Sequence, residues 1–306
     1  MTTRRVVVTG AAGFLGHHVA SRLARSGWQV IGIGHGTLSL EQARSWGIDE
    51  WHAADLTFDA LVNACAAPDA IIHCAGSGAV GYSLSHPFQD FHRSCASVAA
   101  ALEYARLRSK PAPVVYLSSA AVYGQASALP TREDAPIAPA SPYGFHKSLG
   151  ETLCRMYGAH YGVPTAIVRL FSVYGTGLRK QLLWDACGKA KRGDLEFGGT
   201  GEETRDWLHV EDAAELICHM LHEAAPSCPV ANGGTGEAPT VRAVLTALLR
   251  QLGVSHDPRF SGIGRPGDPK HFQADISTAR GSGWTPRIDW RSGVAAYAHW
   301  YQSGQT

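Results

Sequence analysis

Short apolar runs alternate with longer amphipathic stretches through the first half of the chain. The runs that we predict as strands are Arg5–Thr9, Gln29–Ile33, Trp51–Ala54, Ala70–Cys74, Val114–Leu117 and Thr165–Leu170. The stretches that we predict as helices are Phe14–Ser26, Phe58–Ala66, Phe88–Arg108 and Tyr143–Tyr161. Short, wholly apolar strands that alternate with helices are typical of a parallel sheet covered on both faces. With right-handed crossovers, this pattern predicts an α/β fold with a doubly wound parallel sheet.

The pattern becomes looser after Leu170. A helix with a basic end is expected within residues 177–194, and residues 208–224 read as a strand followed by a helix with an acidic start. From about Asp257 onward, Gly and Pro interrupt short helical stretches. We therefore predict a main domain of residues 1–170 plus about 206–235, and a smaller C-terminal lobe of about 171–205 and 236–306.

Composition narrows the class of partner. The 306 residues carry a formal net charge of +1, so no overall field attracts nucleic acid or an acidic membrane. No run approaches the ~18 apolar residues of a membrane span, and a strand that begins at Arg5 leaves no room for a targeting segment. We expect a soluble, cytoplasmic protein without a nucleic-acid or membrane partner.

The cysteines predict neither disulfides nor a metal site. They form no CxxC pair and no short Cys/His ligand spacing, and they are Cys65, Cys74, Cys95, Cys154, Cys187, Cys218 and Cys228. An odd number without a signal peptide indicates reduced thiols. We interpret all seven as small apolar packing residues, and we predict no metal among the scattered histidines.

A glycine-rich turn follows the first strand and opens the first helix. Gly10, Gly13 and Gly16 stand at GxxGxxG spacing, with Phe14 and Leu15 inside the motif. Glycines there permit a tight turn and a close approach of backbone to pyrophosphate, and the helix N-terminus supplies amides and a partial positive charge. This context predicts that the main domain is a Rossmann-type dinucleotide-binding domain.

The end of the second strand bears on the choice of cofactor. A carboxylate at this position accepts from the 2′-hydroxyl of NAD and repels the 2′-phosphate of NADP. Here the chain has Gly34 and His35 instead, and His35 could donate to a phosphate. Asp55 and Leu56, just past the third strand, could meet the adenine. We therefore favour NADP(H), with NAD(H) as the alternative.

Tyr143 and Lys147 stand four residues apart and project from one helical face. A phenol is a poor proton donor or acceptor at neutral pH, and a neighbouring ammonium should lower its pKa toward the working range. The preceding strand brings Ser118 and Ser119 to the carboxyl edge of the sheet, where open α/β folds bind ligands. A hydroxyl there can hold a substrate oxygen.

Together these residues resemble the extended short-chain dehydrogenase/reductase family, in the branch that acts on nucleotide sugars. The resemblance covers nearly the whole chain. The motifs that carry it, in order, are TGAAGFLG (Thr9–Gly16), IIHCAG (Ile71–Gly76), LSSAAVYG (Leu117–Gly124), YGFHK (Tyr143–Lys147), RLFSVYG (Arg169–Gly175), RDWLHVED (Arg205–Asp212) and RPGD (Arg265–Asp268).

The resemblance implies catalytic and cofactor roles. Tyr143 would be the acid/base, Lys147 would lower its pKa and bind the cofactor ribose, and Ser119 would hold the reacting sugar oxygen. Ala75 and Gly76 would line the nicotinamide side. The residues implied to bind cofactor are Gly10, Gly13, Phe14, Leu15, Gly16, Gly34, His35, Asp55, Leu56, Ala75, Gly76, Lys147 and Phe171.

The resemblance also implies a nucleotide-diphosphate sugar as the substrate, held partly by the smaller lobe. Arg205 and Arg265 would clamp the diphosphate, and Asp268 would lie near the nucleotide ribose. Lobe-closing salt bridges are the alternative role for these three residues. Ser119 and Ser172 complete the implied substrate contacts.

Departures from the family pattern narrow the reaction. Dehydratases of this family carry an acid within two positions after the catalytic serine or threonine, but this chain has Ala120 and Ala121. A 4,6-dehydratase is therefore disfavoured. Two asparagines common in the family are replaced, one by Ser172 and one near Ser94, which weakens the transfer of fine substrate contacts.

Three functions remain. The first is NADPH-dependent reduction of a 4-keto-deoxysugar nucleotide with Tyr143 as the acid, which the missing acid after the second strand favours. The alternative is an NAD-dependent nucleotide-sugar 4-epimerase of the UDP-hexose type. A non-catalytic NADP-sensing regulator is disfavoured because such proteins lose the Tyr or the Lys.

The resemblance implies a homodimer as well. Family members pair through a four-helix interface, and the corresponding helices here are Phe88–Arg108 and Tyr143–Tyr161.

Overall fold

The structure is a computed structural model that describes residues 4–78, 80–263 and 270–304. The chain forms two compact units. The first unit comprises the residues up to Gly124, Pro136–Leu170 and Ala214–Ala231, and the second comprises Gln125–Ala135, Phe171–Ala213 and the residues from Asn232 onward. Relative to the predicted boundaries, residues 125–135, 206–213 and 232–235 belong to the second unit.

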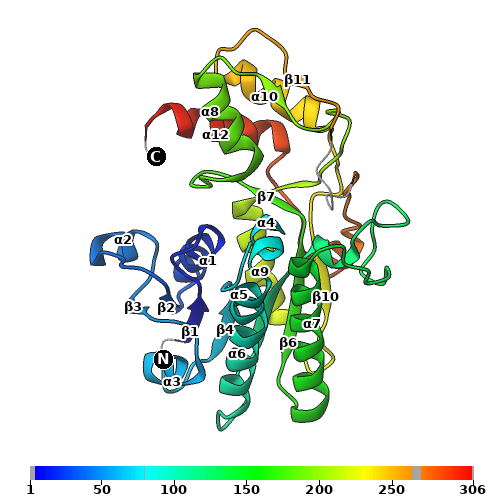
Figure 1. The fold of residues 1–306 in the computed structure, drawn as a ribbon. Coiled ribbons are helices and arrows are strands. Elements are labelled where there is room, and N and C mark those ends of the chain that lie inside the picture. Colours follow the sequence, from blue (N-terminus) through cyan, green and yellow to red (C-terminus); the bar gives the residue numbers. More distant parts are fainter. Residues whose placement is uncertain (1–3, 79, 264–269, 305–306) are drawn as a thin grey trace. The chain divides into compact units, whose positions relative to one another are not determined.

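A seven-stranded sheet with strand order β10-β6-β5-β4-β1-β2-β3 dominates the fold (Figure 1). Its strands are β1 (Arg5–Thr9), β2 (Gln29–Gly34), β3 (Glu50–Ala53), β4 (Ala70–His73), β5 (Val114–Ser119), β6 (Thr165–Leu170) and β10 (Val230–Gly233). Strand β1 pairs in parallel with both β2 and β4, so the strand order reverses beside β1. Ligands of doubly wound sheets bind at the carboxyl ends of the strands at such a reversal. The predicted α/β doubly wound fold is confirmed.

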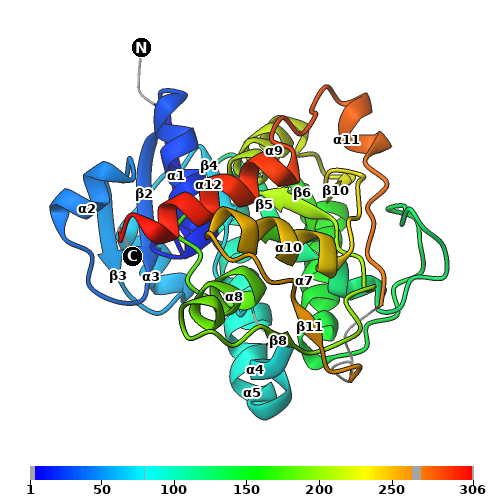
Figure 2. The ribbon, with the colours of Figure 1, turned by 90° about the horizontal axis from the view of Figure 1, so that it is seen from above.

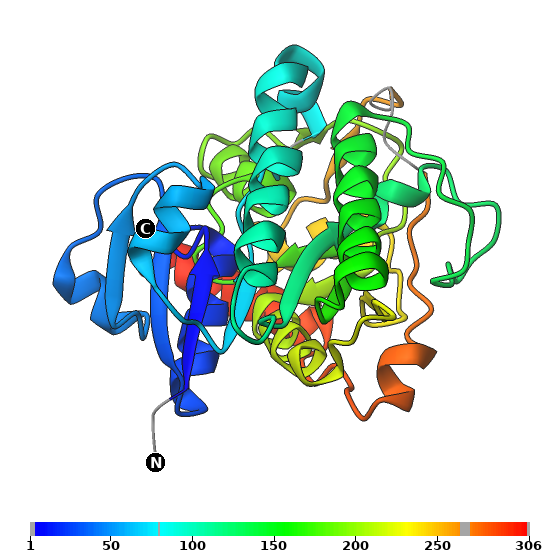
Figure 3. The ribbon, with the colours of Figure 1, turned by 90° about the horizontal axis from the view of Figure 1, so that it is seen from below.

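Helices cover both faces of this sheet. The α-helices that precede residue 181, together with α9, are α1 (Phe14–Arg25), α2 (Leu40–Ser45), α3 (Phe58–Ala64), α4 (Val80–Ser85), α5 (Pro87–Phe91), α6 (Ser97–Arg106), α7 (Pro142–Tyr161) and α9 (Val210–Glu223). Residues of α3, α6 and α7, among them Leu61, Leu102 and Cys154, form a buried cluster with strand residues. Figure 3 shows α6 and α7 side by side on one face of the sheet and α9 on the other. A two-armed ion pair between Arg22 and Glu215 joins α1 to α9.

The predicted helix Phe88–Arg108 is helical from Pro87 to Arg106, but its middle is not an α-helix. Between α5 and α6 the chain makes a π-helical turn, η1 (His92–Ala96). At its end, Oγ of Ser97, the first residue of α6, donates back to the carbonyl oxygen of Arg93 in η1 at 2.6 Å. π-helical turns inside α-helices occur frequently at functional sites, and η1 buries Ser94 and Cys95.

The second unit contains two small parallel sheets and its own helices. The strand pairs are β7 (Ser172–Tyr174) with β9 (Trp207–His209) and β8 (Glu196–Phe197) with β11 (Arg259–Phe260). The helices are α8 (Gln181–Lys191), α10 (Val241–Gln251), α11 (Ser277–Gly281) and α12 (Trp290–Gln302), of which α8, α10 and α12 pack together (Figure 2). We predicted that about 206–235 belong to the main domain. Of the two strands in this range, β9 pairs with β7, and β10 joins the main sheet.

The cysteines are all unpaired, as predicted. Five are buried, and Cys74 and Cys218 are partly buried. Burial raises the pKa of Cys95 to about 11 and that of Cys187 to about 12, so both remain neutral thiols. Within the described ranges, no helix has the length and apolar character that crossing a membrane requires.

Candidate active site

In the glycine turn after β1, neighbouring backbone leaves no space for a side chain at Gly10 or Gly16. Gly10 has φ +65°, and a Cβ on it would lie 2.9 Å from the backbone of Ala75. A Cβ on Gly16 would lie 2.1 Å from the carbonyl oxygen of Gly10. Gly13 caps α1 without a side chain, which leaves the amides of the first turn for a ligand. The turn therefore fits the diphosphate of a dinucleotide.

The end of β2 itself carries Gly34 and His35 instead of an acid, but a carboxylate from another segment approaches it. His35 Nδ1 lies 3.0 Å from Asp55 Oδ1, and both side chains are exposed. The carboxylate therefore comes from the segment after β3 rather than from β2 itself. Gly34 is buried, and a Cβ on it would lie 3.5 Å from Gly10 Cα, so this position adjoins the glycine turn.

Local sequence places Tyr143 at the start of α7. Ser141 caps the helix by accepting from the amide of Gly144, and Pro142 occupies the first turn. A Cβ on Gly144 would lie 2.6 Å from the carbonyl oxygen of Ala121, so glycine lets α7 approach the short helix η2 (Ala120–Tyr123). Tyr143 itself donates its amide to Ser83 Oγ at 3.0 Å. The first turn of α7 is thus held from two sides.

Lys147 is buried one turn further along α7. Its Nζ donates to the carbonyl oxygen of Leu117, on β5, at 2.8 Å. The same atom lies 5.9 Å from the centroid of the Tyr143 ring and 3.6 Å from a Cβ built on Gly76. The structure therefore brings Tyr143, Lys147 and Gly76 together, as predicted.

Burial shifts the pKa values of Lys147 and Tyr143 in opposite directions. It lowers the pKa of Lys147 to about 8, against the charge of Asp90 and other neighbours, which raise it. It raises the pKa of Tyr143 above its ordinary value, while a hydrogen bond with Ser119 lowers it. We expected the ammonium to lower the Tyr143 pKa overall, and that expectation is wrong for the protein alone because desolvation of the phenolate dominates.

The two serines at the end of β5 have different surroundings. Ser119 Oγ accepts from the amide of Ala121 at 3.2 Å and is also hydrogen-bonded to Tyr143. Ser118 is buried and donates to Glu151 Oε1 at 2.7 Å. Glu151 in turn forms a buried bidentate pair with Arg169. Only Ser119 therefore remains a candidate for a substrate oxygen.

Sequence reasoning missed a buried polar chain beside the glycine turn. Thr9 Oγ1 accepts from the amide of Ala75 and contacts His73 Nδ1, both at 3.1 Å. The other ring nitrogen of His73 lies 3.3 Å from Ser97 Oγ, whose hydroxyl proton goes to a backbone carbonyl. Ser97 must then accept from His73 Nε2–H, which assigns the tautomer and makes Thr9 the donor to Nδ1.

These hydrogen bonds hold the backbone at Ala75, the residue before Gly76. Burial, then the charge of Lys147, lowers the pKa of His73 to about 3, so the imidazole is neutral. The signal was present in the sequence as a histidine at the end of the apolar strand β4, although only the fold shows its partners.

Predicted substrate residues occur in the second unit. Arg205 donates to the carbonyl oxygens of Thr204 at 2.8 Å and Lys270 at 3.1 Å. The next residue, Asp206, is buried and accepts from the amides of Thr235, Gly236 and Ala274. This carboxylate ties together three segments of the unit.

The remaining predicted contacts fall partly outside the described residues. Ser172 is on β7 and donates its amide to the carbonyl oxygen of Asp206 at 3.0 Å. Phe171 is buried and packs edge-on against Phe272. Arg265 and Asp268 lie outside the described residues.

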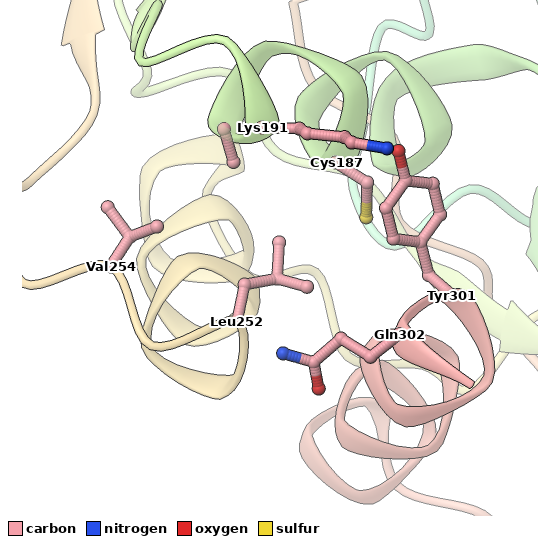
Figure 4. Close-up of a pocket in the computed structure, with 7 residues that line it drawn as sticks. Cys187, Lys191, Leu252, Val254, Tyr301 and Gln302 are labelled. Atoms are coloured by element: carbon pink, nitrogen blue, oxygen red, sulfur yellow. The ribbon is translucent and has the colours of Figure 1, made fainter. Parts of the chain in front are cut away.

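The second unit also has a pocket of about 310 Å³. Its lining residues are Cys187, Ala190, Lys191, Leu252, Val254, Tyr301 and Gln302. In Figure 4 the amine of Lys191 points toward the hydroxyl of Tyr301. Of the predicted catalytic, cofactor and substrate residues that the structure describes, none is among these lining residues.

Comparison with known proteins identifies relatives along the whole chain. The UDP-glucose 4-epimerase of Azospirillum brasilense is 31% identical over 96% of this chain and 90% of its own. UDP-glucuronate 4-epimerase 3 of Arabidopsis thaliana is 28% identical over 98% of this chain and 78% of its own. The structure of the UDP-glucuronic acid 4-epimerase from Bacillus cereus, with UDP-glucuronic acid and NAD, superposes with a TM-score of 0.87 at 25% identity, covering 98% of this chain and 99% of that one.

These relatives are 4-epimerases, so they favour the alternative function over the reductase that the sequence analysis ranked first. The predicted NAD(P)-dependent enzyme of nucleotide sugars agrees with them. The family model of the NAD dependent epimerase/dehydratase family matches residues 6–230. The chain belongs to this family, which confirms the resemblance inferred from its motifs.

Proposed function

We propose that the protein is an NAD-dependent UDP-sugar 4-epimerase. The observation that carries this proposal is the joint placement of Tyr143, Lys147 and Ser119 at the carboxyl end of β5, with Gly76 beside the Lys147 ammonium. Relatives named as UDP-sugar 4-epimerases along nearly the whole chain support it.

Each side chain has a defined task in this reaction. The Tyr143 phenolate takes the proton of the C4 hydroxyl and later returns it to the same oxygen. Ser119 hydrogen-bonds to Tyr143 and is positioned to hold that oxygen. NAD⁺, when bound, would supply a hydride acceptor for C4, and the same hydride would return to the other face of C4 after the 4-keto sugar turns over. The proton and the hydride are each removed once and returned once per turnover, so the reaction needs no added reductant.

Lys147 favours the phenolate by its charge. Its Nζ is bonded to Leu117 O and lies over the Tyr143 ring rather than on its oxygen. With a pKa of about 8, the ammonium is mostly protonated at neutral pH. Desolvation raises the Tyr143 pKa, and in this proposal a positive charge at Lys147 opposes that rise once the phenolate forms.

The acid at Asp55 supports NAD over the NADP(H) that the sequence favoured. Asp55 Oδ1 lies 3.0 Å from His35. His35 directly follows β2, and the end of this strand normally meets the adenosine ribose. A carboxylate there accepts from a 2′-hydroxyl and repels a 2′-phosphate. The NAD bound to the Bacillus cereus relative is in line with this assignment.

We keep the substrate and oligomer assignments as proposals of the same kind. Arg205 and Arg265 would hold the nucleotide diphosphate, Asp268 would lie near the nucleotide ribose, and Ser172 would contact the substrate. For a homodimer, α5 and α7 carry exposed apolar side chains, namely Phe88, Phe91, Phe145 and Leu149. Sedimentation or light scattering of the purified protein tests the dimer, and Phe145→Glu should shift it toward monomer.

The decisive test of function incubates the purified protein with UDP-glucose and UDP-glucuronic acid, with NAD⁺ as the only added cofactor. An epimerase forms the C4 epimer to equilibrium without net NADH. Tyr143→Phe should abolish this turnover while NAD⁺ affinity persists. Stoichiometric NADPH consumption with a 4-keto-deoxysugar nucleotide would establish the reductase instead, and cofactor binding without turnover would indicate a sensor.

A further inference from the structure

A carboxylate that the mechanism above does not use is buried beside the catalytic pair. Asp90, on α5, has no exposed surface. Its Oδ2 is hydrogen-bonded to His146 Nδ1 across to α7. Its Oδ1 is buried without a hydrogen-bond partner in the part of the chain that the structure describes. Burying a carboxylate oxygen in this way costs free energy, so the arrangement needs a compensating reason.

His146 stands between Tyr143 and Lys147 in the motif YGFHK. Besides Asp90, two groups hold it. The ring packs edge-on against Phe91 at 5.7 Å, and the backbone carbonyl accepts from Cys95 Sγ at 3.4 Å. The α5–η1 segment therefore grips α7 at the residue next to the catalytic lysine.

From this geometry we propose that Asp90 and His146 are a positioning pair for the active site. The pair fixes the first turns of α7, and the carboxylate sets the charge that Tyr143 and Lys147 experience. This inference rests on the proposed epimerase activity.

The charge of Asp90 reaches both catalytic groups. It raises the pKa of Lys147, opposing burial, and it adds to burial in raising the pKa of Tyr143. Other titratable groups also face Tyr143 and Lys147 from the elements packed around them. They are His73 and Cys74 at the end of β4, Cys95 in η1, Tyr116 in β5 and Glu151 in α7. Asp90 therefore keeps Lys147 protonated over a wider pH range, but it also makes the Tyr143 phenol less acidic.

Replacing Asp90 by an uncharged residue should shift the pKa values of both catalytic groups in a defined direction. Asp90→Asn keeps a hydrogen-bonding partner for His146 but deletes the charge. The pKa of Tyr143 and that of Lys147 should then both fall. Activity needs a phenolate and an ammonium, so both limbs of the pH profile should move to lower pH. Asp90→Ala removes the hydrogen bond as well and should also lower the melting temperature.

The experiment compares the wild type, Asp90→Asn, Asp90→Ala and a matched control, Glu103→Gln. Glu103 is a partly exposed carboxylate of α6 paired with Arg106, and it is not among the charges that act on Tyr143 or Lys147. Two readouts are taken on the NAD-loaded proteins. One is the pH profile of UDP-sugar epimerisation, and the other is the absorbance of the Tyr143 phenolate against pH, with Tyr143→Phe subtracted.

In Asp90→Asn we expect both the profile and the phenolate titration to move to lower pH, with KM for the UDP-sugar within about twofold of wild type because no substrate contact is removed. Glu103→Gln should move neither. An unchanged titration and profile in Asp90→Asn, with melting temperature lost in Asp90→Ala, would make the pair simple packing and overturn the proposal. If no variant turns over UDP-sugar but the phenolate titration shifts, the function fails while the role of the pair stands.

Discussion

The Nζ atom of Lys147 lies 5.9 Å from the centroid of the Tyr143 ring, and its hydrogen bond goes to a backbone carbonyl of β5 rather than to the phenol. The hydrogen bond ties the lysine directly to the sheet edge, so we expect any action of the ammonium on the tyrosine to be through its charge. Removing the ammonium should affect catalysis far more than folding.

Lys147→Met keeps the length of the side chain and deletes the charge. We expect kcat to fall by about two to four orders of magnitude, the range typical of lost acid–base assistance. In the wild type, the ammonium is lost as pH rises through about 8, so kcat should decline on that side. Initial rates between pH 6 and about 10 measure both effects, with Lys191→Met, a change of an exposed lysine in the second unit, as control. Unchanged turnover in Lys147→Met would remove the residue from catalysis.

Local patterns predicted much of this site. The glycine turn, the strand ends and the Tyr143–Lys147 spacing are read within a few residues, because strand and helix periodicity is a local property. What escaped prediction depends on contacts between distant segments. His35 meets Asp55 across two strand ends, His146 meets Asp90 across two helices, and β9 pairs with β7 rather than with the main sheet. No local period encodes such pairings.

Asp55→Asn tests the choice of cofactor. Losing a carboxylate beside the ribose position should tighten NADP binding and weaken NAD binding, changing the ratio of the two dissociation constants by about tenfold, or about 1.4 kcal/mol. Equilibrium titration of protein fluorescence with each cofactor measures the ratio without any turnover. Asp59→Asn, which alters an exposed acid in the first turn of α3, should leave it unchanged. Equal ratios in the wild type and Asp55→Asn would refute the assignment of Asp55.

His73 should make the fold sensitive to acid. Its pKa is lowered by burial to about 3 in the folded protein, so the unfolded chain binds a proton near the ordinary value while the folded chain does not. Stability is therefore undiminished above that ordinary value and falls as pH drops toward 3, by about 2 kcal/mol between pH 7 and pH 5 from this group.

Denaturant unfolding at the two pH values measures this loss. His73→Asn, which has no titrating ring, should lose stability at pH 7 but show a smaller further loss at pH 5. His222→Gln, at an exposed position in α9, should keep the wild-type pH dependence. Parallel losses in the wild type and His73→Asn would show that other groups control the acid response.

The buried pair of Glu151 and Arg169 should be costly to break. Arg169 holds both carboxylate oxygens, at 2.9 and 2.8 Å, and also donates to Tyr123 Oη at 2.8 Å. Glu151→Ala leaves a buried guanidinium without its counter-charge, and we expect a loss of about 3–5 kcal/mol in unfolding free energy. Arg155 contacts the same carboxylate from a more exposed position, so Arg155→Ala should cost under about 1 kcal/mol. Similar losses in the two variants would contradict a special role for the buried pair.

The carboxylate of Asp206 has a consequence for anyone who wishes to redirect this protein toward another sugar. Libraries for that purpose would naturally randomise the stretch around Arg205, yet its immediate neighbour joins backbone amides that lie 29, 30 and 68 positions away along the chain. Most replacements of Asp206 would remove these hydrogen bonds and destabilise the segments that support residue 205. A useful library would vary residue 205 and hold residue 206 constant.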